Sequence, residues 1–224
     1  MALALWLVYR FVVLQPTNQR DWEYGMQVLL HVTVDGNVVT VEHERDFQWS
    51  ADGSSSPAYI ESSFDVRRLE HVWCVEEPFT MAPFYAFKGV AHTYFVFDFE
   101  NQPPVAISVE ARRQRDETYD VVRGSFNAYE LIYIWATEQD ATGRRAVAIC
   151  TNELARVANE VQPGAVPPNI GLIFPGYADQ ELYALGFIPK DAPFDTVRQR
   201  YAISQAVRDT IDQPDFSQQL RSRL

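Results

Sequence analysis

The pattern of apolar and polar positions changes along the 224-residue chain, from alternation early on to helical spacing later. Runs of β-branched and aromatic residues with every second position apolar are typical of strands. The runs LLHVTV (29–34) and NVVTVEHE (37–44), joined by Asp35-Gly36, predict a β-hairpin. Further strands are predicted within 62–79, 89–100 and 105–113, and around Tyr129 to Ala136.

Helical spacing first appears in TNELARVANEV (151–161), where Leu154, Val157, Ala158 and Val161 share one helix face. Two more helices are predicted, in 178–187 and in 194–211. Strands that come first and helices that follow are typical of an α+β fold, so we expect an antiparallel sheet with helices packed beside it.

The first residues form a separate apolar segment, unbroken from Ala2 to Leu14 except for Arg10. A helix that crosses a bilayer needs about 20 residues, and this run ends at Pro16. It also lacks the charged start and the cleavage site of a signal peptide. The end of a membrane anchor, a buried first strand and an interfacial helix all fit. We expect residues 1–15 to be the end of an anchor and residues 16–224 to form a single α+β domain.

The net charge of −11 limits the classes of partner. Without a basic patch the chain is unsuited to nucleic acid, and the same charge disfavours electrostatic docking on anionic lipid. The four histidines and two cysteines lie far apart, with no metal-ligand spacing. We therefore predict no metal site, no cofactor and no nucleic-acid partner.

Cys150 is the first candidate for chemistry, because it lies just before the helix predicted at 151–161. Thr151 is a plausible N-cap residue, and the positive end of a helix lowers the pKa of a thiol and favours the nucleophilic thiolate. The alternative is a small buried hydrophobic residue. Cys150 and Cys74 could also form a disulfide, or both be free.

His92 and Glu110 are the second candidate pair. Alternation places His92 with Tyr94 and Val96, away from the aromatic face that we expect to be the core face. If the strands on either side of the NQPP turn (101–104) form a hairpin, His92 and Glu110 become neighbours on one face. A carboxylate there would fix the tautomer of the imidazole. The alternatives are a histidine bonded to backbone and a solvated edge glutamate balanced by Arg112 or Arg113.

Other polar residues favour structural roles. The islands RDF (45–47) and EQD (138–140) lie next to strands and are candidates for buried ion pairs. His31, His43 and His71 are expected to be structural or exposed, and Cys74 to be an inert strand residue.

Seven stretches of this chain resemble one known family. They are PTNQRDW (16–22), VDGNVVTVEHERDFQW (34–49), VAHTYFVFDF (90–99), the stretch 107–140, CTNELARVANEV (150–161), FPGYADQELYALGFI (174–188) and PDFSQQLR (214–221). With their AHT, S-x-E-x-R, YEL-x-Y and PGY-x-D motifs, these stretches are similar to the Lnb N-terminal periplasmic domain family.

The resemblance implies a bacterial inner-membrane protein whose domain faces the periplasm, with a circularly permuted NlpC/P60-like (papain-like) thiol-enzyme fold. It implies N-acylation of lipoproteins, in which an acyl chain passes from phospholipid through a cysteine thioester to an amino group. By motif, the family's cysteine falls on Cys150, its histidine on His92 and the S-x-E-x-R glutamate on Glu110.

Three departures from the family pattern lie close to Cys150. Ile149 replaces the usual asparagine, and only Ala141 to Ile149 separate the acidic motif from Cys150. The acidic motif reads Glu138-Gln139-Asp140 in place of Glu-Arg-Asp. Three hypotheses follow: a thiol acyltransferase, a cysteine amidase or peptidase acting on cell-wall peptides, and a non-catalytic binding or scaffold module that keeps the fold.

Overall fold

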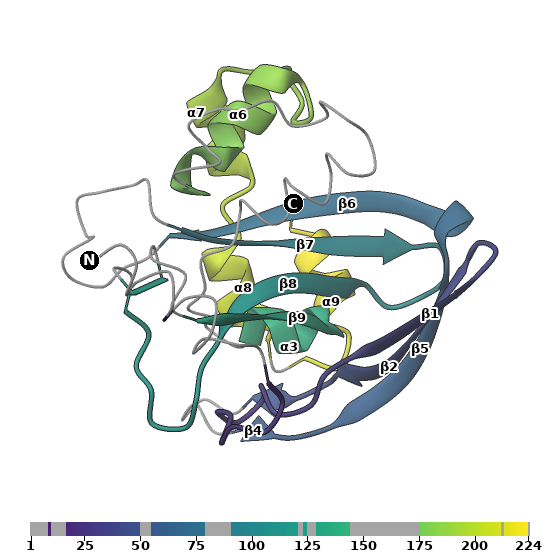
Figure 1. Ribbon diagram of the computed structural model, residues 1–224. Coiled ribbons are helices and arrows are strands. Elements are labelled where there is room, and N and C mark those ends of the chain that lie inside the picture. Colours follow the sequence, from purple (N-terminus) through teal and green to yellow (C-terminus); the bar gives the residue numbers. More distant parts are fainter. Residues whose placement is uncertain are drawn as a thin grey trace.

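The computed structural model describes residues 9, 17–49, 55–78, 91–120, 123–124, 129–143, 175–211 and 213–223 (Figure 1). Cys150 and the helix predicted at 151–161 lie outside the described residues. So does the predicted anchor segment, apart from Tyr9.

Seven strands of the described residues form one sheet, in the order β1-β2-β9-β8-β7-β6, with β5 also paired to β2. The strands are β1 (His31–Asp35), β2 (Val38–Arg45), β5 (Tyr59–Asp65), β6 (Leu69–Pro78), β7 (Ala91–Phe99), β8 (Val105–Arg112) and β9 (Glu130–Thr137). Every pairing is antiparallel except a single parallel contact between β2 and β9. Two short strands, β3 (Gln48–Trp49) and β4 (Ser55–Ser56), form a separate pair.

The predicted β-hairpins are confirmed. β1 and β2 pair up to Asp35↔Val38 around a turn in which Gly36 has a φ of +59°, a backbone conformation that glycine adopts without strain. β7 and β8 pair across the predicted NQPP turn. The turn chemistry of the sequence therefore fixed the register of both hairpins.

The described helices are short and follow the strands, so the α+β class is confirmed. They are α3 (Glu138–Gly143), α6 (Ala178–Leu185), α7 (Phe194–Arg200), α8 (Ser204–Thr210) and α9 (Phe216–Arg221), with the 3-10 turns η2 (Val66–Arg68) and η4 (Pro175–Tyr177). α3, α8 and α9 gather behind the sheet, and α6 and α7 lie beyond β6 (Figure 1). None of these helices combines the length and hydrophobicity that a membrane crossing requires.

The single helix predicted at 194–211 is wrong, because the structure divides it into α7 and α8. The amide of Ala202 bonds to the carbonyl of Gln199, a tight turn that ends α7, and α8 starts only at Ser204. Helix α9 was not predicted at all.

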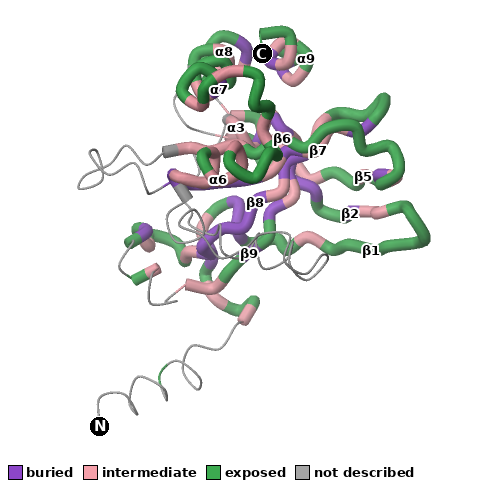
Figure 2. Tube along the Cα trace, turned by 90° about the horizontal axis from the view of Figure 1, so that it is seen from above, coloured by how far each residue is buried: buried purple, intermediate pink, exposed green. Residues whose placement is uncertain are grey.

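Both faces of the sheet carry a core, which corrects the expectation that His92 faces away from it. On the His92 face Tyr94, Val96 and Ala106 pack together, next to the cluster of Met26, Ile132, Ile134 and Ala136. On the other face, Val41 of β2 and Phe64 of β5 pack against Phe99 of β7 and Val105 of β8. Burial is concentrated along β7, β8 and β9, whereas β1 is exposed (Figure 2).

Candidate functional site

His92 and Glu110 lie on adjacent strands and are both buried. β7 and β8 pair as Phe95↔Ile107 and Val96↔Ala106, and the same register carried toward the start of β7 leads to His92 and Glu110. His92 is 1% exposed and Glu110 is 2% exposed. The reading of Glu110 as a solvated edge charge is therefore wrong. A buried histidine and carboxylate on one face fit the predicted pair.

Ser108 links the two side chains. Nε2 of His92 lies 3.1 Å from Oγ of Ser108, and this hydroxyl donates to Oε1 of Glu110 at 3.4 Å. The imidazole also stacks on the ring of Tyr94, with 5.7 Å between the centroids. We call His92, Ser108 and Glu110 the relay.

The direction of the relay determines the tautomer of His92. A hydroxyl has one hydrogen to donate. When Ser108 donates to an ionised Glu110, its oxygen can only accept from His92, so Nε2 carries the hydrogen. Nδ1 then holds the lone pair and can act as a base.

The arginines suggested as partners for Glu110 have other bonds. Arg112 donates from Nε to the carbonyl of Met26 (3.0 Å) and from Nη1 to Oδ1 of Asn18 (2.8 Å). Its guanidinium also lies 4.1 Å from the centre of the Trp22 ring. Arg112 therefore fixes the segment that leads to β1.

The prediction that the polar islands form buried ion pairs is confirmed, and the structure pairs the two islands with each other. Arg45 of β2 donates to Asp140 of α3 from Nε (2.7 Å) and from Nη2 (3.1 Å), and these side chains are 4% and 0% exposed. Asp140 also accepts from the backbone amide of Phe47 (3.1 Å) and the indole of Trp49 (2.8 Å). Because a buried carboxylate is costly unless it is fully bonded, this set of donors holds α3 against β2.

A β-bulge in β2 turns Arg45 toward the relay. Pairing with β5 shifts between Glu42 and Glu44, so His43 is the extra residue, and it has a φ of +65°. Strict alternation would place Arg45 on the face of Val41. The bulge moves the Arg45 side chain to the opposite face. The backbone of Arg45 pairs with that of Ala136 in β9.

Arg45 and the relay share one small cavity. The cavity measures about 10 Å³ and is lined by Arg45, His92, Tyr94, Ala106, Ser108, Glu110, Ile134, Ala136 and Ala141. This is close to the volume that one water molecule needs.

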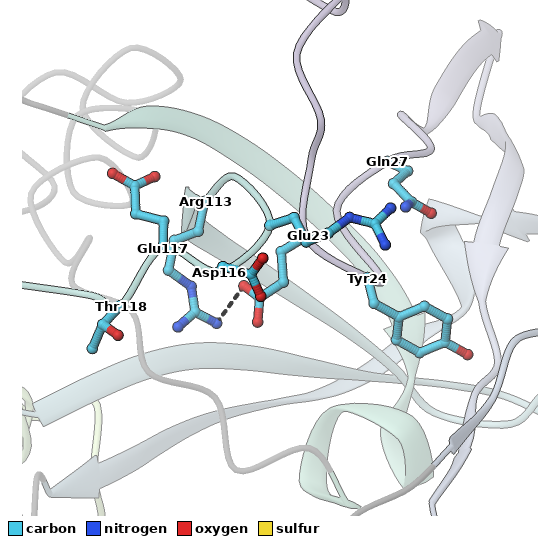
Figure 3. A pocket seen from close by; sticks show the side chains of 8 residues that line it. Glu23, Tyr24, Gln27, Arg113, Asp116, Glu117 and Thr118 are labelled. Carbon is cyan, nitrogen blue, oxygen red and sulfur yellow. Dashed lines mark ion pairs between the residues drawn. The ribbon is translucent and has the colours of Figure 1, made fainter.

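A larger groove of about 590 Å³ lies between residues 23–27 and 113–118. Figure 3 shows Glu23 and Arg113 in contact within it, and they form an ion pair of 2.7 Å. The lining is polar, with Tyr24 as its aromatic member. The same segment borders the Arg45 site, because a Cβ on Gly25 would lie 3.7 Å from Nη1 of Arg45.

The other predicted candidates can be placed only in part. Cys150 lies outside the described residues, so its position relative to His92 stays a prediction. Cys74 on β6 is an exposed free cysteine, and His31, His43 and His71 are exposed, as expected.

Sequence reasoning assigned no role at the site to Ser108, and none beyond an ion pair to Arg45. The signal for Ser108 was its place two residues before Glu110, on the same face. The face of the sheet that carries Arg45 could not be predicted, because no feature of VEHER (41–45) indicates the bulge at His43.

Comparison with known proteins gives one match. Residues 56–148 match the family model of the Lnb N-terminal periplasmic domain. The match includes His92 and Glu110, ends before Cys150, and confirms the resemblance over this part of the chain. This part of the chain is therefore similar to the Lnb N-terminal periplasmic domain. No curated protein and no solved structure matches the chain.

Proposed function

We propose that this protein is a thiol-dependent acyltransferase that moves an acyl chain from phospholipid, through a thioester on Cys150, to the amino group of a lipoprotein. The buried relay is the observation that carries the proposal. A hydrophobic core does not need a buried histidine hydrogen-bonded through a serine to a carboxylate. A histidine that acts as a general base needs such partners, because they hold its ring and its tautomer.

The chemistry follows from the tautomer. Nδ1 of His92 takes the proton of the Cys150 thiol, and the thiolate attacks the ester carbonyl of the lipid. The lysophospholipid alcohol leaves with the proton from His92, and the acyl group remains on sulfur as a thioester. The acceptor amine then attacks the thioester carbonyl and loses a proton to His92. The C–S bond breaks, the amide product leaves, and the Cys150 thiolate takes the proton back from His92.

The resemblance supports the rest of the proposal. The permuted NlpC/P60-like order places the histidine strand before the cysteine helix, which agrees with β7 preceding Cys150 in the chain. Residues 16–224 would form one periplasmic domain, held at the inner membrane by an anchor that ends within residues 1–15.

A second candidate is favoured by one observation. The groove between residues 23–27 and 113–118 is lined mainly by charged and polar side chains, with Tyr24 as its aromatic member. A polar groove suits a peptide better than an acyl chain, which favours an amidase or peptidase acting on cell-wall peptides. In that enzyme water replaces the amine in the second step.

Trapping of the acyl-enzyme separates these functions. The full chain would be incubated with a phospholipid that carries an alkyne-tagged acyl chain, and its peptides would be analysed by mass spectrometry. We expect a hydroxylamine-sensitive adduct on Cys150 in the wild type and in Cys74→Ala, and none in Cys150→Ala. Release of peptide from cell-wall fragments without this adduct would favour the second candidate, and neither product would leave a non-catalytic module.

A further inference from the structure

Arg45 has one nitrogen that its ion pair does not use. Asp140 engages Nε and Nη2, which leaves Nη1. This atom is buried and has no hydrogen-bond partner among the residues that the structure describes. A buried donor without a partner costs about 1–3 kcal/mol, so its position calls for an explanation.

The cavity supplies a place for that partner. Arg45 borders it together with Ser108 and Glu110, and its volume of about 10 Å³ is near that of one water molecule. A buried water needs from two to four polar groups around it. Nη1 can donate to such a water, and the water can donate onward to the Glu110 carboxylate.

We propose that Arg45 is a positioning residue of the relay, whose Nη1 holds the Glu110 carboxylate through one water molecule in this cavity. The bulge at His43 is the feature that brings Arg45 to this face. The pair with Asp140 holds the guanidinium in place, and the remaining nitrogen acts on Glu110.

The effect on His92 follows from the direction of the hydrogen bonds. An ionised Glu110 accepts from Ser108, which leaves Nδ1 of His92 as the base. A protonated Glu110 could donate to Ser108, which would then donate to Nε2 and leave the hydrogen on Nδ1. Arg45 favours the ionised carboxylate and so keeps the tautomer that acid–base chemistry at Cys150 needs.

The other ionisable groups that the structure describes near His92 do not supply this effect. Glu77 of β6 is opposite His92 in register, Glu138 of α3 acts on the neighbouring Tyr94, and Asp140 of α3 binds Arg45. All three are carboxyl groups, and Tyr94 contacts the imidazole with its ring. Arg45 is the arginine among the described residues that line the cavity, whereas Arg221 of α9 pairs with Asp98 and Glu138.

The proposal rests on the proposed function for its purpose, but its test needs neither substrate nor turnover. The full chain would be labelled with ¹⁵N-histidine, and His92 would be assigned by the signal lost in His92→Gln. Nitrogen chemical shifts at a pH where His92 is neutral distinguish the two tautomers. We expect the Nε2–H form in the wild type.

The decisive variant replaces both partners, Arg45→Met with Asp140→Asn, so that no buried charge loses its partner. We expect at least half of His92 to move to the Nδ1–H form. Asp140→Asn alone keeps the arginine and should keep the wild-type tautomer. Arg45→Lys, which keeps the ion pair and loses Nη1, covers the case in which the double variant does not fold, and it should shift in the same direction.

The wild-type tautomer in the double variant, or in Arg45→Lys if only that variant folds, would overturn the proposal. An equal shift in Asp140→Asn would also overturn it, because Arg45 would then act only through packing. Absence of a trapped acyl-enzyme, together with the expected tautomers, would count against the proposed function and leave the role of Arg45 standing.

Discussion

Ser108 is the smallest member of the relay and sets its direction. Its hydroxyl links the imidazole of His92 to the carboxylate of Glu110, at 3.1 Å and 3.4 Å. Ser108 therefore determines which nitrogen of His92 is the base, although its sequence context is that of an ordinary strand serine.

Replacement of this serine tests the relay. We expect Ser108→Ala to slow formation of the acyl-enzyme about 100-fold, in the range of a general base that loses its orientation. The rate would be followed with the tagged phospholipid. Ser63→Ala is the matched control, because Ser63 is exposed and bonds to Thr40 on another strand pair. Equal rates for Ser108→Ala and the wild type would contradict the assignment.

At the scale of elements, the bulge in β2 decides which side chains reach the site. His43 holds it with a φ of +65°, a conformation that costs most side chains about 1–2 kcal/mol. Its ring donates from Nδ1 to the carbonyl of Leu29 at 3.1 Å, which offsets part of that cost.

Two substitutions at His43 separate backbone strain from side-chain contacts. Glycine adopts a positive φ freely, so His43→Gly should change the free energy of unfolding by less than about 1 kcal/mol. A β-branched side chain is strongly disfavoured there, and His43→Val should cost at least about 1–2 kcal/mol more than His43→Gly. Urea unfolding of both variants measures the difference. A valine variant as stable as the glycine variant would show that the bulge is not held in this conformation.

A carboxylate cluster joins α6 and α7 to the edge strand β6. Arg198 donates from Nε to Asp179 at 3.0 Å and lies 3.5 Å from Glu76. The backbone amide of Asp179 also bonds to Glu76. Burial, with the charge of Asp179, raises the pKa of Glu76 from 4.5 to about 7.

This cluster predicts a specific pH dependence. Because the folded state holds the proton of Glu76 more tightly than the unfolded state, Glu76 stabilises the fold most below about pH 4.5 and loses that contribution as pH rises toward 7. Glu76→Gln should therefore be more stable than the wild type at pH 8, by about 1 kcal/mol after allowance for solvent screening, and no more stable at pH 4.5. Urea unfolding at both pH values measures this.

Glu70→Gln provides the comparison, since Glu70 is an exposed residue of the same strand. A gain at pH 8 that is the same in both variants, or no gain in either, would contradict the raised pKa of Glu76.

At the scale of the whole molecule, the C-terminal helix closes the face of the sheet that carries the relay. Arg221 of α9 pairs with Asp98 of β7 at 3.0 Å and with Glu138 of α3 at 2.7 Å. Its guanidinium also lies 4.9 Å from the centre of the Trp73 ring. Burial raises the pKa of Glu138, and Arg221 opposes that shift. One side chain near the end of the chain thus ties three elements together.

We expect Arg221→Met to reduce the free energy of unfolding by about 3 kcal/mol, because it leaves two carboxylates behind without their partner. Arg223→Met removes a similar side chain whose pair with Asp209 is exposed, and should cost less than about 1 kcal/mol. Thermal or urea unfolding compares the two. Similar losses would mean that α9 is held by its apolar residues alone.

The sequence predicted those parts of the fold that depend on local patterns. Alternation and the NQPP turn placed His92 and Glu110 on one face, and the two polar islands around Arg45 and Asp140 formed the predicted ion pair. Alternation alone could not show that both faces of the sheet are covered, because the cover on each face comes from elements distant in sequence.

Helix α9 and the bulge show the limit of pattern reading. The helix has one buried apolar pair, Phe216 and Leu220, which is too short a signal to predict an element. The bulge inserts one residue, His43, and reverses the face of every residue after it in β2. The role of Arg45 therefore becomes visible only in three dimensions.

The central claim is that His92 activates Cys150, and its most direct test is the rate of Cys150 alkylation by iodoacetamide across pH, read by peptide mass spectrometry on the full chain. Cys74, a free cysteine whose pKa is raised to about 12 by desolvation and by Glu76 and Asp179, serves in each digest as the internal reference for a thiol without activation. We predict that Cys150 reacts readily below the ordinary thiol pKa of about 8.5 and that His92→Ala slows it at least about tenfold near pH 7, with no change at Cys74. A Cys150 that is inert, or equally reactive without His92, would contradict the account.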